Sequence, residues 1–124
     1  MNRPLDDRGL PPGYPLQPAL ELTPRQVKAG LDAGTIALID CRTPEEHSAA
    51  HIAAATLIPL NDLAAKAGEI DALSDDATVV ILCHHGHRSL TAALYLRHHG
   101  IEAMSMAGGI DLWSQDIDPT VPRY

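Results

Sequence analysis

Residues 78–89 read TVVILCHHGHRS, in which a β-branched apolar run ends in a cysteine and then turns through glycine. A run such as that from Thr78 to Leu82 is typical of a buried strand in a parallel sheet. The apolar spacing from Ser89 to His98 predicts a helix directly after the turn. Cys83 is therefore expected at the carboxyl end of a strand, facing a helix N-terminus whose free N–H groups and dipole stabilise a thiolate.

Helices and short strands alternate on both sides of this segment. Residues 23–26 (TPRQ) and 43–46 (TPEE) have the pattern of a capping box with proline at the first helical position, which predicts two helix starts. The other elements are expected as strands over residues 36–40, 55–58 and 103–106 and as helices over residues 61–70 and 109–115. This alternation predicts an α/β fold with a central parallel sheet of about five strands and short helices on both faces.

The length of 124 residues fits one domain and is too short for two. Residues 1–20 contain five of the ten prolines, so we expect an N-terminal arm without regular elements, followed by a domain over residues 21–124. The arm either wraps the domain or extends away from it.

Composition excludes several classes of partner and environment. The net charge of −7, with 16 acidic and 9 basic residues, argues against nucleic acid and anionic membranes as partners. No apolar run is long enough for a membrane span. The two cysteines, Cys41 and Cys83, fit neither a disulfide scaffold nor a zinc motif, which predicts a cytoplasmic protein.

Three segments resemble the motifs of the rhodanese-like sulfurtransferases. The first is the loop that begins at Cys83. The second is LIDCRTPEEH over residues 38–47, followed by Ala50-His51-Ile52, and the third is MAGGIDLW over residues 106–113. Their order and spacing are similar to those of one rhodanese domain, so the resemblance implies a rhodanese-like fold.

The resemblance implies a sulfurtransferase in which Cys83 is the catalytic nucleophile. Cys83 would take sulfane sulfur from a small donor such as thiosulfate as a persulfide and pass it to cyanide or a thiol. The loop amides would hold the persulfide, Arg88 would hold the anionic end of the donor, and Gly86 would supply a positive φ. The substrate-binding residues are then His84, His85, Gly86, His87, Arg88 and Ser89. We expect no cofactor and no metal, with the histidines as solvated rim residues.

Four residues of the second motif have expected roles beside the loop. Asp40, Arg42 and Glu46 are predicted to form structural ion pairs. Cys41 is either a small buried core residue or a redox partner of Cys83, because the cell-cycle phosphatases that share this fold have a cysteine at the corresponding position.

Two other functions compete with sulfur transfer. Cysteine phosphatases and arsenate reductases are the enzymatic alternative, but a phosphatase loop places five residues between cysteine and arginine, whereas four separate Cys83 from Arg88. A rhodanese module that binds or regulates without turnover is the other alternative. The last residues, 117–124, resemble the tails of rhodanese domains attached to cofactor-sulfuration enzymes, which suggests a sulfur-relay protein as a partner.

Overall fold

The sheet at the centre of the molecule has five parallel strands. The computed structural model describes residues 4–124 and orders the strands β1-β5-β4-β2-β3. The strands are β1 (Glu21–Leu22), β2 (Ile36–Asp40), β3 (Thr56–Leu57), β4 (Thr78–Leu82) and β5 (Ala103–Met106). The predicted parallel sheet of about five strands is confirmed. The sequence pattern does not indicate β1, because two residues are too few to show an alternation.

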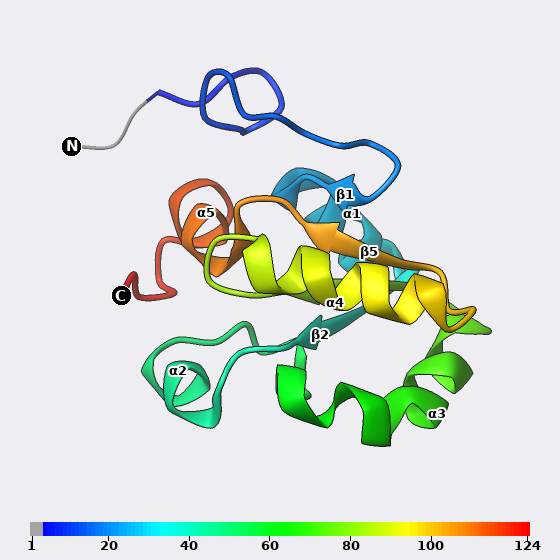
Figure 1. The fold of residues 1–124 in the computed structure, drawn as a ribbon. Coiled ribbons are helices and arrows are strands. Elements are labelled where there is room, and N and C mark those ends of the chain that lie inside the picture. Colours follow the sequence, from blue (N-terminus) through cyan, green and yellow to red (C-terminus); the bar gives the residue numbers. More distant parts are fainter. Residues whose placement is uncertain (1–3) are drawn as a thin grey trace.

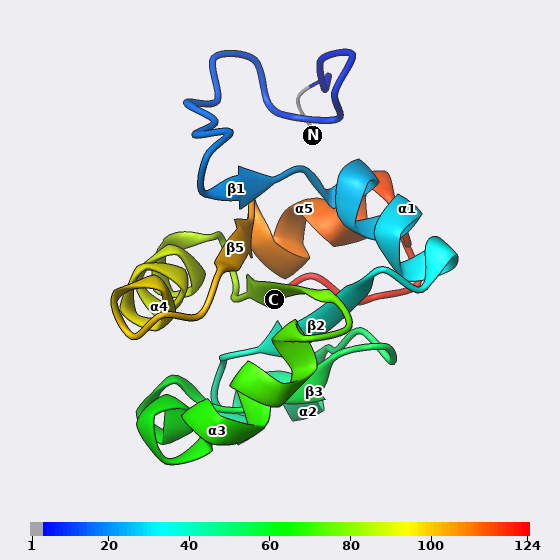
Figure 2. The same cartoon turned by 90° about the vertical axis from the view of Figure 1, so that its right-hand side faces the viewer.

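Helices cover both faces of the sheet. They are α1 (Pro24–Ala33), α2 (Pro44–Ala49), the 3₁₀ turn η1 (Leu60–Asp62), α3 (Leu63–Ser74), α4 (His87–His98) and α5 (Gly109–Asp116). Figure 2 shows α1 and α5 on one side of the sheet and α3 and α4 on the other. Buried side chains on the α3 and α4 side include Ile39, Ile70, Ile81 and Leu96. Those on the α1 and α5 side include Val27, Leu38, Val80 and Trp113.

Both predicted capping boxes are present and fix where α1 and α2 begin. The Thr23 hydroxyl accepts from the Gln26 amide at 3.2 Å, and the Gln26 side chain accepts from the Thr23 amide at 2.9 Å. Thr43 and Glu46 make the same pair of bonds at 3.2 and 3.3 Å. Each box satisfies N–H groups that have no partner inside their helix.

The N-terminal arm wraps the domain instead of extending away from it. Residues 4–20 contain turns but no helix or strand. Leu10 is fully buried and packs with Ala107 and Leu112. Figure 1 shows the arm crossing the molecule beside α5 and β1.

The carboxyl ends of β2 and β4 meet at one end of the sheet and carry the two cysteines. Asp40 is in register with Leu82, and the Cys41 amide donates to the Leu82 carbonyl at 3.0 Å. The loop before α4, helix α2 and the C-terminus lie at the same end (Figure 1). In the described part of the chain, no helix is both long enough and apolar enough to cross a membrane.

Candidate active site

Cys83 lies at the end of β4 with three hydrogen-bonding groups around its sulfur. Its Sγ accepts from the amides of Gly86 at 3.1 Å and Ser89 at 3.3 Å, and it lies 3.3 Å from the Ser89 hydroxyl. The residue is only 1% exposed. A buried thiolate is costly unless it is hydrogen-bonded, and the two amides donate to the sulfur. The Ser89 hydroxyl accepts from the thiol and can donate to the sulfur once the thiol has lost its proton.

The first turn of α4 supplies the Ser89 amide and hydroxyl that surround the sulfur. It can do so because α4 begins at His87, two residues earlier than the sequence predicts. Gly86 precedes the helix with φ 105°, a backbone conformation that other residues rarely adopt. The helix has no side-chain cap of its own, and Ser89 is its third residue. The Cys83 sulfur therefore occupies the place that a capping oxygen takes in other helices.

Helix α5 holds the outer side of the same loop. The amides of Ile110 and Asp111 donate to the carbonyls of Cys83 and His84 at 2.9 and 3.1 Å. A Cβ atom at Gly109 would lie within 2.5 Å of both carbonyl oxygens, so only glycine fits there. Since the carbonyls face α5, the loop amides are free to face the sulfur.

Arg88 is paired with Glu46 of α2. Its Nη1 and Nη2 atoms donate to the two carboxylate oxygens at 2.5 and 2.8 Å, a bidentate geometry. Arg88 lowers the pKa of Glu46 well below its ordinary value of 4.5, although burial opposes the effect. The carboxylate in turn raises the pKa of Arg88. The guanidinium that we expected to face a donor is thus held by a neighbouring helix.

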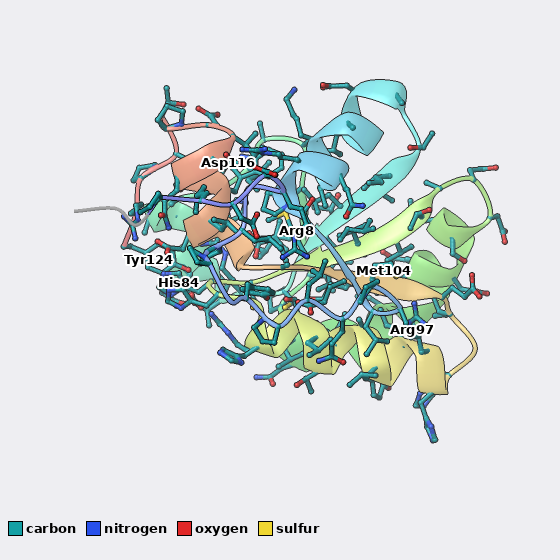
Figure 3. All side chains as sticks on the ribbon, turned by 90° about the horizontal axis from the view of Figure 1, so that it is seen from above. Arg8, His84, Arg97, Met104, Asp116 and Tyr124 are labelled. Carbon is teal, nitrogen blue, oxygen red and sulfur yellow. The ribbon has the colours of Figure 1, made fainter. Side chains whose placement is uncertain are left out.

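Tyr124 joins the C-terminal segment to this pair and to the loop. Its hydroxyl donates to Glu46 Oε2 at 2.6 Å. Its ring stacks on His84 with centroids 4.0 Å apart, and His84 stacks on His85 at 3.9 Å. Figure 3 shows Tyr124 beside His84 at the edge of the molecule. Burial and the neighbouring His85 lower the pKa of His84 below 6.5, so its ring is mainly neutral at pH 7.

The ion pairs expected in the second motif are only partly as predicted. Arg42 and Asp40 form a fully buried pair, with Nη2 to Oδ2 at 2.6 Å. Arg42 donates only to the backbone carbonyl of Glu46, at 3.3 Å, and does not form an ion pair with the Glu46 carboxylate. The ionic partner of Glu46 is Arg88. Arg42 also donates to the carbonyl of Ala50 at 2.6 Å and to the Tyr124 hydroxyl at 2.9 Å. The buried guanidinium thereby ties β2 to the segment after α2.

Cys41 is a free, buried thiol in the same apolar cluster as Cys83. Burial, and secondarily the Cys83 charge, raises the pKa of Cys41 to about 12. Cys41 also lines a small cavity of about 190 Å³ to which Thr43, Leu60, Asn61 and Arg88 contribute. Its redox role stays a prediction.

Among the described residues, one side-chain group could hold a metal ion. Ligand atoms of His84, His85 and Asp111 all lie within 4.8 Å of one another. The Asp111 carboxylate already accepts from Arg123 at 2.8 Å and from Gln115 at 3.1 Å. His84 is partly buried, and His85 and His87 are exposed. Their role as rim residues and the expected lack of a metal stay predictions.

Three residues near the loop are not indicated by the sequence analysis. The Ser105 hydroxyl lies 2.8 Å from the Ser89 hydroxyl, in a buried position on β5. The Tyr14 hydroxyl accepts from the Gly108 amide at 3.2 Å and donates to the buried Glu21 at 2.9 Å. Tyr124 is the third. Only Ser105 has a sequence signal, because it lies two residues after Ala103 and therefore on the same side of a short apolar strand.

The fold and the site together define a parallel α/β domain with a cysteine loop at the carboxyl end of its central strand. Residues 23–116 match the model of the rhodanese-like domain, and the chain belongs to that family. This confirms the resemblance found in the three motifs.

Several sulfurtransferases are similar to this chain. It is 35% identical over 105 residues to the probable adenylyltransferase/sulfurtransferase MoeZ of Mycobacterium tuberculosis, a match that covers 83% of this chain and 26% of MoeZ. It is 32% identical over 93 residues to the thiosulfate sulfurtransferase GlpE of Stutzerimonas stutzeri, covering 74% of this chain and 82% of GlpE. The structure of the human single-domain sulfurtransferase TSTD1 is 27% identical with a TM-score of 0.68, covering 78% and 96% of the two chains. The chain thus spans about a quarter of MoeZ and most of GlpE and TSTD1.

Proposed function

We propose that this chain is a sulfurtransferase that carries sulfane sulfur as a persulfide on Cys83, from a donor such as thiosulfate to cyanide or a thiol. The observation that supports this most directly is the convergence of the Gly86 amide, the Ser89 amide and the Ser89 hydroxyl on one sulfur atom. Such preorganised donors stabilise the anionic sulfur before and after transfer.

The proposed reaction has two displacement steps. The Cys83 thiolate attacks the outer sulfur of thiosulfate, a new S–S bond forms, and the electrons of the broken bond leave with sulfite. Cyanide then attacks the outer sulfur of the persulfide, forms thiocyanate and returns the Cys83 thiolate. The other loop amides, from His84 to Arg88, would hold the outer sulfur, and neither step needs a cofactor.

The relatives support a protein acceptor as well. MoeZ, the MOCS3 proteins of maize and Uba4 of Ogataea parapolymorpha combine adenylyltransferase and sulfurtransferase in their names. By analogy, a sulfur-relay protein would be a partner of this chain. The cytoplasmic location stays a prediction.

Intact mass spectrometry tests the proposal. After incubation with thiosulfate, or with a thiol persulfide, we expect a gain of one sulfur atom that cyanide removes. Cys83→Ser should remain folded and gain nothing, because a hydroxyl cannot form a persulfide. Cys41→Val is the matched control and should still gain sulfur.

The alternatives predict different results. A module that only binds or regulates would gain no sulfur from any donor. A phosphatase would gain none and would hydrolyse an aryl phosphate, a reaction that we expect to be absent. Folded Cys83→Ser with appreciable sulfur transfer would contradict the assignment of the nucleophile.

A further inference from the structure

In the described part of the chain, the arginines of the second motif, the loop and the C-terminal segment are paired with carboxylates. Arg88 is held by both oxygens of Glu46, Arg42 by Asp40, and Arg123 by Asp111. An arginine whose hydrogen bonds are already satisfied by a carboxylate offers little net charge to an incoming anion, because the carboxylate repels that anion from nearby.

Several contacts hold the Glu46–Arg88 pair in place. The bidentate geometry fixes both side chains, and the side chain of Glu46 is only 20% exposed. Tyr124 donates to the same carboxylate at 2.6 Å, and Arg42 donates to the Tyr124 hydroxyl at 2.9 Å. The lowered pKa of Glu46 keeps it ionised across the neutral range. Releasing Arg88 would therefore disturb the whole hydrogen-bond network of Arg88, Glu46, Tyr124 and Arg42, and not only one contact.

The groups that bond to the Cys83 sulfur carry no net charge. The amides of Gly86 and Ser89 and the Ser89 hydroxyl bond to sulfur. The His84 ring is mainly neutral at pH 7, for the reasons given above. Amides and hydroxyls suit a sulfur with no more than one negative charge. A compact dianion such as thiosulfate loses far more hydration on entering such a site.

We propose that Glu46 is a specificity-determining residue: by holding Arg88, it makes the site select donors of low negative charge, such as the persulfide of an organic thiol, over dianionic thiosulfate. The inference rests on the proposed sulfur transfer through Cys83. Thiosulfate still reacts, but with a low kcat/KM. The stacked rings of Tyr124, His84 and His85 beside the loop offer apolar contact to the organic part of such a donor.

The test compares the parent with Glu46→Gln, using thiosulfate and cysteine persulfide as donors and cyanide as acceptor. Glutamine keeps the capping box, since Gln26 serves the same function after Thr23 in α1. With the charge removed, Arg88 becomes available to a dianion. We expect kcat/KM for thiosulfate to rise roughly tenfold, while that for the persulfide changes by less than about twofold.

Glu45→Gln is the matched control. It removes the same charge from the neighbouring exposed position on α2 and leaves Arg88 paired. We expect the ratio of the two kcat/KM values to stay at that of the parent. An equal rise in Glu45→Gln would show a general charge effect and overturn the proposal, as would an unchanged ratio in Glu46→Gln.

A second variant covers the case in which Glu46→Gln fails to fold. Glu46→Asp keeps the charge but shortens the side chain by one methylene, so the bidentate pair with Arg88 is lost and thiosulfate use should rise by about twofold; no rise would overturn the proposal. The persulfide of a cysteine-containing peptide, tested beside cysteine persulfide, separates a polypeptide donor from a small-molecule donor.

If no donor loads Cys83 in the parent, the proposed function fails. If donors load it and the ratio does not respond, only the role of Glu46 fails.

Discussion

Two serine hydroxyls lie behind the nucleophile in an otherwise apolar layer. Ser89 and Ser105 are fully buried, their oxygens are 2.8 Å apart, and the Ser89 oxygen is 3.3 Å from the Cys83 sulfur. When Ser105 donates to Ser89, the Ser89 hydroxyl is free to donate to a sulfur anion. Hydrogen bonds in such a chain strengthen one another where water is excluded. We therefore predict that Ser105 is a positioning residue that acts on the sulfur through Ser89.

We predict that Ser105→Ala slows persulfide formation on Cys83 about fivefold, because the Ser89 hydroxyl loses the partner that directs it. The free energy of unfolding should fall by about 1 kcal/mol. Stopped-flow loading and chemical denaturation measure the two effects.

Ser114→Ala is the control for this prediction. Ser114 is also buried, but its hydroxyl donates only within α5, to the Ile110 carbonyl at 3.0 Å. This variant should lose stability without slowing the loading of Cys83. Equal loading rates in the parent and Ser105→Ala would show that Ser105 only fills space.

The register between β2 and β4 determines which residues face each other across the site. Asp40 pairs with Leu82, so Cys41 and Cys83 follow at neighbouring places on adjacent strands. Adjacent strands are about 4.8 Å apart, which falls within the Cα separation of a disulfide. Both thiols also belong to the cluster on the α3 and α4 side of the sheet. The geometry thus permits a bond between them.

We predict that Cys41 protects Cys83 from irreversible oxidation. Peroxide converts the Cys83 thiolate to a sulfenic acid and releases hydroxide, and the Cys41 thiolate then displaces a second hydroxide to form the disulfide. The high pKa of Cys41 makes this second step slow at pH 7 and faster as the pH rises. After peroxide and then a thiol reductant, the parent should recover more transferase activity than Cys41→Val. Equal recovery, with no peptide linking the two cysteines, would make Cys41 a core residue only.

At the level of helices and strands, the sequence predicts most of the fold. The capping boxes and the apolar run of β4 are local signals, and the elements they predict are present. The start of α4 differs because the Ser89 amide donates to the Cys83 sulfur, six positions earlier, and this bond caps a helix that begins at His87. The ionic partner of Arg88 cannot be found from local sequence patterns, because Glu46 lies 42 positions earlier in the chain.

Over the whole molecule, segments from both ends of the described chain support the loop. Tyr14 of the arm contacts Gly108 just before α5, and Tyr124 contacts Glu46 and His84. Burial and the hydrogen bond to Glu21 raise the pKa of Tyr14 to about 12, so its hydroxyl remains a donor. Neither contact could be predicted from the sequence, because irregular segments have no periodicity that indicates where they pack.

The stability of the molecule should depend on pH through Glu46. Its pKa is lowered in the folded state, so its contribution is complete above its ordinary value of 4.5 and is lost as the pH falls from there towards the folded value. We predict that the parent exceeds Glu46→Gln by about 1 kcal/mol in the free energy of unfolding at pH 7, a modest figure because Arg88 is partly exposed. Urea denaturation at pH 7 and below pH 4 measures the difference, which should shrink at low pH. A difference that does not change with pH would exclude an ionic origin.

Trp113, buried on α5, has a spectroscopic consequence. The chain has one tryptophan, so all indole fluorescence comes from a helix whose first turn binds the carbonyls of Cys83 and His84. Sulfur arriving on Cys83 adds volume to the loop that this turn holds and moves the negative charge outward by one atom. We therefore predict that the emission of Trp113 changes on loading and discharge, which would give an optical readout in real time without a coupled assay or a label; identical spectra of the loaded and unloaded protein would contradict this.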